Sequence, residues 1–538
     1  AAVALLAAAC SGGSSGGGAA SGAYLKWAPC CSWGTTWSLN FYNPLALTIG
    51  EGLIQLPLAV ENDPSLTSFT PQLATSWKAS GNTLTINLRQ GVNWQNSQPV
   101  TSTDVLDTIL LNGLGGAGGA SAAAGTGGWV YISGVSAPNS HEVVVSTRPG
   151  ADMTLLEDEL FVATILPSSQ YGQFVTSSLK QDEVAYYAQA AKNPTAAGKS
   201  PQYAAMQAAF KKLSAYNPPK LLGDGPFELK AINTAEALLT KWSGFYDASS
   251  IHIPGIDYLN DQNQGIYPLL LGHQADFSNV YMSPAILKQW QATQGSHTAI
   301  PHGFTFDMVF NSHQYPLNMT AVRQALAYLI PRANMVSSAY GGSSVADRGG
   351  VLNTTPDGLP AYLDSLYMTP SQIASLNTYP VNDAKATSLL DSAGFHKSGG
   401  KWIEPNGKPF TLSFLVNSAT SDIVSSCDTA ATALTAFGIG SSLDATQGTI
   451  QSQDVYSGNF QVSVDLTGGP NPLYNNIDQM LGSLQNYETV GNYAGDRGLG
   501  FGPTESVPGL GSVNIPATID QESEQVGPGP QMNKLVYD

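Results

Sequence analysis

The stretch 71–111 constrains the fold more than any other part of the chain, because it specifies several elements in a fixed order. Leu84, Ile86 and Leu88 alternate with polar residues, which is the period-2 pattern of a half-buried strand. Gly91 ends this strand, and Gln98–Pro99 follows as an extended entry, since the residue before a proline avoids the helical region. The sequence therefore predicts a strand, a turn and an extended segment.

A helix is predicted to come next. Thr101 is suited to the N-cap, and Asp104 stands three residues later, the spacing of a capping box. Apolar residues then recur at helical spacing up to position 110. The Gly- and Ala-rich segment 112–128 is predicted to be a flexible surface loop.

Length and charge limit the class of protein. A chain of 538 residues is too long for one core, so two or three domains are expected. Only 11% of the residues are charged, and the net charge is −17. This acidity argues against nucleic-acid binding, which needs a basic face, and against electrostatic attraction to anionic lipid.

The N-terminus has the features of an export signal. Residues 1–9 form a short apolar run that ends in small residues directly before Cys10, and a Gly/Ser-rich tether follows. This arrangement resembles a bacterial lipobox, in which Cys10 would be lipidated and residues 1–22 would comprise signal remnant, lipobox and tether. The alternative is an ordinary cleaved signal with an incidental cysteine. No later stretch is long and apolar enough for a transmembrane helix.

The remaining cysteines are Cys30, Cys31 and Cys427. Export implies an oxidising compartment, so one of the adjacent pair could bridge to Cys427; alternatively, all three are free thiols. No CxxC pattern occurs, which argues against a zinc site.

Catalytic and metal-binding motifs are not found in the sequence. It contains no GxSxG, HExxH or P-loop pattern, and its seven histidines are scattered. The nearby pair His297 and His302 is assigned a structural or surface role. We therefore expect a binding protein without enzymatic activity, cofactor or metal.

Periodicity predicts alternating strands and helices along the rest of the chain. Strands are expected at 129–132, 142–146, 228–232, 251–259, 304–311, 410–416 and 460–466. Helical segments are expected at 153–166 (mixed with strand), 181–216 (interrupted by Pro194 and Pro201), 266–272, 322–329, 383–393 and 430–437.

Several sequence blocks share one order and spacing with a known family. The blocks PQLATSWKAS…LTINLRQGVNWQNSQPVTSTDV, GDGPFELK, GIDYLNDQNQGIYPLLLGHQADF, FDMVFNSHQYPLNMTAVRQALAYLIPRANMV and DAKATSLLDSAGFHKSGGKWIEPNGKPFTLSFLV resemble the family 5 extracellular solute-binding proteins of ABC transporters. That family includes oligopeptide-, dipeptide- and nickel-binding proteins. The resemblance runs from about residue 36 to 480.

The resemblance implies an α/β fold with two lobes, similar to a type II periplasmic binding protein, and an extra subdomain on the first lobe. Lobe I would comprise 23–52 and 217–276, and the extra subdomain would comprise 53–216. Lobe II would span 277–493, and 494–538 would return to lobe I, complete or truncated.

The resemblance also implies a function. The chain would be a monomeric, lipid-anchored extracytoplasmic protein that captures a solute in an inter-lobe cleft and delivers it to an ABC permease. A peptide is the first expectation for the solute, and an oligosaccharide is the alternative. A surface receptor without transport and an exported hydrolase are more distant alternatives.

Ligand contacts are expected from loop residues at strand ends, where aromatic and amide side chains meet a ligand. The candidates are Trp33, Trp37, Asn40, Tyr42, Tyr281, Asn311, Gly468, Asn471 and Tyr474. Peptide-binding relatives hold the peptide amine with an aspartate. In this chain Asp465 and Asp478 flank the corresponding segment, and neither stands at the usual place.

Overall fold

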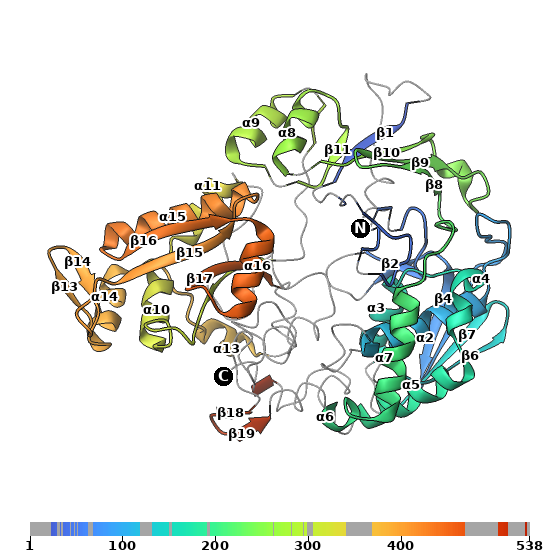
Figure 1. The fold of residues 1–538 in the computed structure, drawn as a ribbon, viewed down its shortest axis with the longest axis horizontal. Helices are drawn as coiled ribbons and strands as arrows, with labels where there is room; N and C mark the ends of the chain where they lie inside the picture. The colour runs from blue at the N-terminus through green and yellow to red at the C-terminus, as the bar shows by residue number, and fades with distance from the viewer. Residues whose placement is uncertain are drawn as a thin grey trace. The chain divides into compact units, whose positions relative to one another are not determined.

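The computed structural model divides the chain into two compact units. Unit 1 holds the described residues up to Asn279, and unit 2 holds those from Val280 onward. Their elements are labelled in Figure 1. The structure describes residues 23–29, 33, 36–43, 45–47, 49–50, 52–62, 68–118, 132–149, 153–190, 194–261, 263–280, 282–293, 295–297, 305–340, 368–467, 504–514 and 533–534.

The stretch 71–111 forms the predicted elements. An antiparallel sheet in the order β4-β5-β7-β6 consists of β4 (Ala74–Ser80), β5 (Thr83–Leu88), β7 (Glu142–Thr147) and β6 (Ile132–Asn139). Leu84, Ile86 and Leu88 are buried along β5, which confirms the period-2 prediction. Strand β6 begins at the last residue of the strand predicted at 129–132 and extends to Asn139, so the turn before β7 lies at Ser140–His141.

Helix α2 (Ser102–Gly118) follows with the expected cap. The backbone N–H of Thr101 donates to Asp104 Oδ2 at 2.8 Å, and the Thr101 hydroxyl also donates to this oxygen. The other carboxylate oxygen, Asp104 Oδ1, accepts the N–H of Ser168 at 2.8 Å. Asp104 therefore joins the start of α2 to a segment 64 residues further along the chain.

The prediction of a loop at 112–128 is wrong for its first part. Helix α2 continues to Gly118, and the rest of the predicted loop lies outside the described residues. Leu111 and Leu114 are fully buried in a cluster of helical side chains, which stabilises this part of the helix. Gly113 allows the close packing, since a Cβ at this position would lie 1.8 Å from Glu183 Oε1.

Helices pack beside this sheet and α2. Gln181–Tyr216 was predicted to be helical with two proline interruptions, and the structure confirms this: Pro194 begins α6 and Pro201 begins α7. A proline is well accommodated at the start of a helix, where its missing N–H is not needed. The helices of this layer are α3 (Met153–Val162), α4 (Ser168–Tyr171), α5 (Ser177–Ala190), α6 (Pro194–Ala197) and α7 (Pro201–Ser214).

A second sheet of unit 1 has the order β11-β1-β10-β9-β8. Strand β1 runs parallel to β10 and β11, whereas β8, β9 and β10 are antiparallel. The strands are β1 (Leu25–Ala28), β8 (Phe227–Ile232), β9 (Glu236–Lys241), β10 (Gly255–Leu259) and β11 (Phe277–Ser278). Helix α8 (Asn263–Leu271) connects β10 with β11, near the predicted position.

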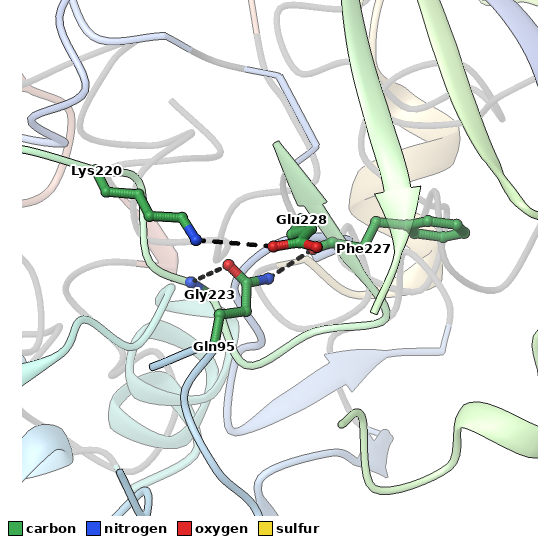
Figure 2. Close-up of polar contacts among 5 residues, drawn as sticks. All are labelled: Gln95, Lys220, Gly223, Phe227 and Glu228. Atoms are coloured by element: carbon green, nitrogen blue, oxygen red, sulfur yellow. Dashed lines mark hydrogen bonds and ion pairs between the residues drawn. The ribbon is translucent and has the colours of Figure 1, made fainter. Parts of the chain in front are cut away.

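Two of the sequence blocks meet in unit 1, as Figure 2 shows. Gln95, from the stretch 71–111, donates through Nε2 to the carbonyl of Phe227 at 2.9 Å and accepts the N–H of Gly223 at 3.0 Å. Lys220 and Glu228 form an ion pair at 3.7 Å beside this contact. The side chain of Gln95 therefore fixes the turn of the GDGPF motif to the extended segment before α2.

Unit 2 is built on a sheet in the order β12-β17-β15-β16. Strand β15 is parallel to β16 and β17, and β12 is antiparallel to β17. The strands are β12 (Thr305–Phe310), β15 (Thr411–Asn417), β16 (Gly440–Thr446) and β17 (Val462–Thr467). The predicted strands at 304–311, 410–416 and 460–466 are thus confirmed within one or two residues.

Helices α10 and α14 agree with the predicted pattern, whereas α15 begins at Ser421, nine residues before the predicted start. Val322, Ala325, Leu326 and Leu329 are all buried on one face of α10. Gly394 follows α14 with φ +87°, as expected for the residue after a helix C-cap. The helices are α9 (Pro284–Gln291), α10 (Thr320–Leu329), α11 (Arg332–Tyr340), α13 (Pro370–Ser375), α14 (Asp383–Ser392), α15 (Ser421–Phe437) and α16 (Gly448–Ser457).

Short hairpins complete the described structure. They pair β2 (Ala59–Glu61) with β3 (Phe69–Pro71), β13 (His396–Ser398) with β14 (Lys401–Ile403), and β18 (Thr504–Val507) with β19 (Gly511–Asn514). Within the parts of the chain that the structure describes, no helix combines the length and apolar character required to cross a membrane.

Cys427 is a free, fully buried thiol in the core of unit 2. The hypothesis of a bridge from Cys427 to the early cysteines is therefore wrong, because this residue packs on α15 among apolar side chains. Cys30 and Cys31 lie outside the described residues. Burial raises the pKa of the Cys427 thiol to about 12.

Candidate ligand-binding site

Trp33 lies at the carboxyl edge of the parallel strands of unit 1. Its backbone N–H donates to Asn260 Oδ1 at 3.0 Å, and Asn260 Nδ2 donates to the Trp33 carbonyl at 3.0 Å. The indole Nε1–H donates to the Asn233 carbonyl at 2.9 Å. Trp33 follows β1 and Asn260 directly follows β10, so both lie where ligands commonly bind in α/β sheets.

The segment 36–47, which follows Trp33 in the sequence, forms a loop whose two ends are joined by hydrogen bonds. The N–H of Ser38 donates to the Leu45 carbonyl at 2.8 Å, and the N–H of Leu47 donates to the Ser38 carbonyl at 2.9 Å. Within the loop, the N–H of Asn43 donates to the Asn40 carbonyl at 3.0 Å. The loop is therefore held in one conformation by its own backbone.

Asn40 anchors this loop and has no free group for a ligand. Its side chain is 0% exposed. Nδ2 donates to the carbonyls of Leu213, at 2.6 Å, and Tyr216, at 3.0 Å, while Oδ1 accepts the N–H of Tyr42. These contacts assign Asn40 a structural role at the end of α7.

Tyr42 is also engaged within unit 1. Its hydroxyl donates to Asn112 Oδ1 at 2.7 Å, and its ring contacts Tyr171 edge-on with 6.2 Å between centroids. Burial, followed by the nearby Tyr171 and Glu183, raises the pKa of Tyr42 well above its ordinary value. The phenol therefore stays neutral and links the loop to α2.

Trp37 and Phe41 are the aromatic residues of the loop that remain accessible. Trp37 is half-buried, and Phe41 is 43% exposed although its backbone N–H is fixed by the Tyr171 hydroxyl. Phe41 was not among the predicted contacts. The sequence shows that this segment is rich in aromatic residues, which indicated a ligand contact, but it does not reveal which rings face solvent.

Asn311 of unit 2 resembles Asn40 in its environment. It directly follows β12 and is 0% exposed. Its Nδ2 donates to the carbonyls of Gly458, at 3.1 Å, and Phe460, at 2.9 Å, and its Oδ1 accepts the N–H of His313. These bonds connect β12 to the segment before β17, so the side chain has a structural role.

The other predicted contacts, Tyr281, Gly468, Asn471 and Tyr474, lie outside the described residues, as do Cys10, His302 and Asp478. The backbone of Asp465 pairs with Asp307 between β17 and β12. Among the residues that the structure describes, no group of three or more His, Cys, Asp or Glu side chains could hold a metal ion.

The two α/β units are typical of one class of protein, the extracellular solute-binding proteins. Residues 68–488 match the family model described as bacterial extracellular solute-binding proteins, family 5 Middle. The chain therefore belongs to the family 5 extracellular solute-binding proteins, as the sequence blocks predicted. A comparison with curated proteins found no match.

Solved structures share the fold at low sequence identity. A periplasmic oligopeptide-binding protein of an ABC transporter from Thermotoga maritima, bound to mannohexaose, is 19% identical with a TM-score of 0.67, covering 96% of this chain and 87% of the other. NikA from Brucella suis, in complex with Fe(III)-EDTA, is 17% identical with a TM-score of 0.66, covering 96% and 90%.

A third solved structure is the oligopeptide-binding protein AppA from Bacillus subtilis in complex with a nonapeptide. It is 16% identical with a TM-score of 0.57, covering 83% of this chain and 79% of the other. These similarities confirm the predicted fold class, a two-lobed type II periplasmic-binding fold.

Family membership also gives the general function. Family 5 proteins bind peptides or small ligands outside the cytoplasm and deliver them to ABC permeases, and they are binding proteins rather than enzymes. The chain is accordingly the solute-binding component of an ABC transport system.

Proposed function

We propose that this protein is a lipid-anchored, monomeric binding protein that captures a peptide and delivers it to an ABC importer. The family match over residues 68–488 carries the proposal, and two of the similar structures are named as oligopeptide-binding proteins. Cys10 would carry the lipid, and units 1 and 2 would correspond to lobes I and II.

An oligosaccharide is the second candidate solute. One similar oligopeptide-binding protein holds mannohexaose, so a related fold accommodates a sugar chain. This chain has only 11% charged residues, and its candidate contacts in unit 1 are aromatic rings. Aromatic faces and amides suit a neutral ligand, and neither predicted aspartate stands at the usual place for binding a peptide amine.

In unit 1 we assign ligand contact to Trp37 and Phe41. Trp33 would hold the start of the loop 36–47 in position. Trp37 and Phe41 are the accessible rings on a loop fixed by backbone hydrogen bonds. A preorganised loop loses little conformational entropy on binding. Asn40 and Asn311, whose amides are fully used, are not part of the proposed contact set.

Isothermal titration calorimetry with a peptide pool and with a neutral oligosaccharide pool tests the ligand class. We expect binding to the peptide pool with micromolar or tighter affinity and no products in the mixture. Binding to the oligosaccharide pool alone would favour the second candidate. Cleavage of either pool would contradict the proposed binding function.

The contact assignment is tested with Trp37→Ala and Phe41→Ala. Loss of a ring that packs on a ligand is expected to weaken binding about tenfold or more, without changing the unfolding midpoint substantially. Trp290→Ala is the control, because this half-buried tryptophan of α9 bonds to His297 in unit 2. Full affinity in Trp37→Ala would remove that residue from the site.

A further inference from the structure

Two carboxyl groups of unit 1 are buried with an oxygen that lacks a hydrogen-bond donor. Asp224 is 0% exposed; its Oδ1 accepts the N–H of Leu56 at 2.9 Å, while its Oδ2 has no partner in the described structure. Glu183 is 6% exposed, and its Oε2 likewise has no partner there. A charged carboxylate in such a place loses its hydration without compensation.

The backbone packs tightly beside Asp224. The turn Gly223–Gly225 lies against the backbone of residues 53–54, where a Cβ on Gly223 would be 1.9 Å from the Ile54 carbonyl oxygen. The backbone N–H groups of Asp224 and Gly225 both donate to this same oxygen. The carboxyl is therefore enclosed by backbone on the side of residues 53–56.

The charged and titratable groups around Asp224 do not neutralise it. From α2 it faces Asp104, a second acid, and from the loop after β9 it faces Tyr246. Two cations of this part of unit 1 have other contacts: Lys220 pairs with Glu228, and Arg89 lies over the Tyr246 ring at 4.5 Å. Burial, with a contribution from Asp104, raises the pKa of Asp224 to about 8.

Glu183 on α5 has a similar environment. It lies against Gly113 of α2, and the titratable groups beside it are Tyr42 from the loop and Tyr187 from its own helix. Tyr187 donates its hydroxyl to the Gly113 carbonyl, and the guanidinium of Arg148 donates to the backbone of Val184 at an exposed position. Burial raises the pKa of Glu183 well above its ordinary value.

We propose that unit 1 folds with Asp224 and Glu183 uncharged, so that this unit is a proton-dependent fold that is most stable in acidic surroundings. The net charge of −17 also favours higher stability at acidic pH, because acidification reduces the mutual repulsion of the many carboxylates. The extracytoplasmic location of the family exposes the protein to the pH of its surroundings. The structure thus fits a protein that works outside the cell at acidic pH.

The direction of the pH dependence follows from proton linkage. A carboxyl whose pKa is raised in the folded state binds a proton that the unfolded chain releases at neutral pH. Its stabilising effect is complete at a pH below the pKa of the carboxyl in the unfolded chain, about 4. The effect is lost as the pH rises through the pKa of the carboxyl in the folded protein, which is about 8 for Asp224. Each such group is expected to raise the unfolding equilibrium constant roughly tenfold per pH unit in this interval.

Denaturant unfolding of the full chain between pH 5 and pH 9 tests the proposal. We expect stability to fall steadily toward pH 8 in the wild type and to fall less steeply in the double variant D224N/E183Q, whose amides have similar shapes without the charge; the raised pKa values of Asp107 and Asp257 leave a residual slope. The matched control is Asp182→Asn, a neighbouring and more exposed acid of α5, which should keep the wild-type pH dependence.

A second measurement decides the case if the double variant does not fold. Calorimetry of wild-type unfolding at pH 7, in buffers with different ionisation enthalpies, counts the protons exchanged. We expect a net release of protons on unfolding, about one of them from Asp224, with a further contribution from Glu183. A wild-type stability that is equal at pH 5 and pH 8, no net release of protons, or an unchanged slope in a folded double variant would each overturn the proposal.

Discussion

Asn40 shows how a polar residue of a ligand-facing loop can serve the fold instead of the ligand. Its amide binds four backbone groups, three of which lie more than 170 residues away in the sequence. Asn40→Ala would leave the carbonyls of Leu213 and Tyr216 without this donor. We expect a loss of about 1–3 kcal/mol in the free energy of unfolding, measured by urea denaturation.

The control for Asn40→Ala is Asn87→Ala on β5, where the exposed amide bonds to the hydroxyl of Ser76. This control is expected to change stability by less than about 0.5 kcal/mol. Equal effects in both variants would contradict the structural role of Asn40.

Cys427 provides a second test at the residue scale. Its thiol is fully buried and its pKa is raised to about 12, so hardly any reactive thiolate exists at neutral pH. Alkylation with iodoacetamide followed by peptide mapping should leave Cys427 unmodified in the native protein and modify it fully in denaturant. Rapid native labelling would show that the core around α15 is open.

The limits of sequence reasoning are visible in these residues. Asn40 and Asn311 were predicted to contact ligand because each stands at a loop or strand end, yet both amides are taken by backbone carbonyls brought in from distant segments. Local sequence does not encode those partners. Phe41 was overlooked for the related reason that exposure depends on the complete fold.

At the scale of elements, periodicity predicted the structure well where packing follows the local pattern. The alternation along β5 and the apolar face of α10 were both confirmed. The failure came at α2, where a glycine-rich composition suggested a loop. The helix persists because Leu111 and Leu114 are buried, and Gly113 leaves space for the side chain of Glu183 on α5.

Two glycines of α2 give a matched test of that explanation. A Cβ on Gly113 would lie 1.8 Å from Glu183 Oε1, whereas a Cβ on Gly115 would meet Tyr42 at an ordinary 3.6 Å. Gly113→Ala should therefore destabilise unit 1 by about 1–3 kcal/mol. Gly115→Ala should be neutral or stabilising by up to about 1 kcal/mol, because alanine favours the helix.

Thermal unfolding of the two single variants checks this pair. If Gly113→Ala were as stable as Gly115→Ala, the close approach of α5 to α2 would not limit the residue at position 113. The same result would weaken the claim that Glu183 is firmly enclosed.

At the scale of the whole molecule, the order and spacing of the sequence blocks were sufficient to predict the family. The family match over 68–488 and the similar solved structures confirm the fold class. The identity of the solute could not be predicted in the same way, since the similar solved structures are under 20% identical to this chain and hold different ligands: mannohexaose, a nonapeptide and Fe(III)-EDTA.

A bound solute should stabilise the entire protein by mass action. At a ligand concentration about 100 times the dissociation constant, the gain is about 2.7 kcal/mol, which corresponds to a rise of several degrees in the unfolding midpoint for domains of this size. Differential scanning fluorimetry with separate peptides and oligosaccharides measures this rise. The Trp37→Ala variant should show a smaller rise with the same compound.

The most direct test of the central claim is native mass spectrometry of the purified protein, before and after mild denaturation and after incubation with the peptide pool and with the oligosaccharide pool. The account predicts a complex of one protein chain with one intact solute, whose mass identifies its class and is lost on denaturation. Failure to retain any solute from the peptide or oligosaccharide pools, or the appearance of cleaved products, would contradict the account.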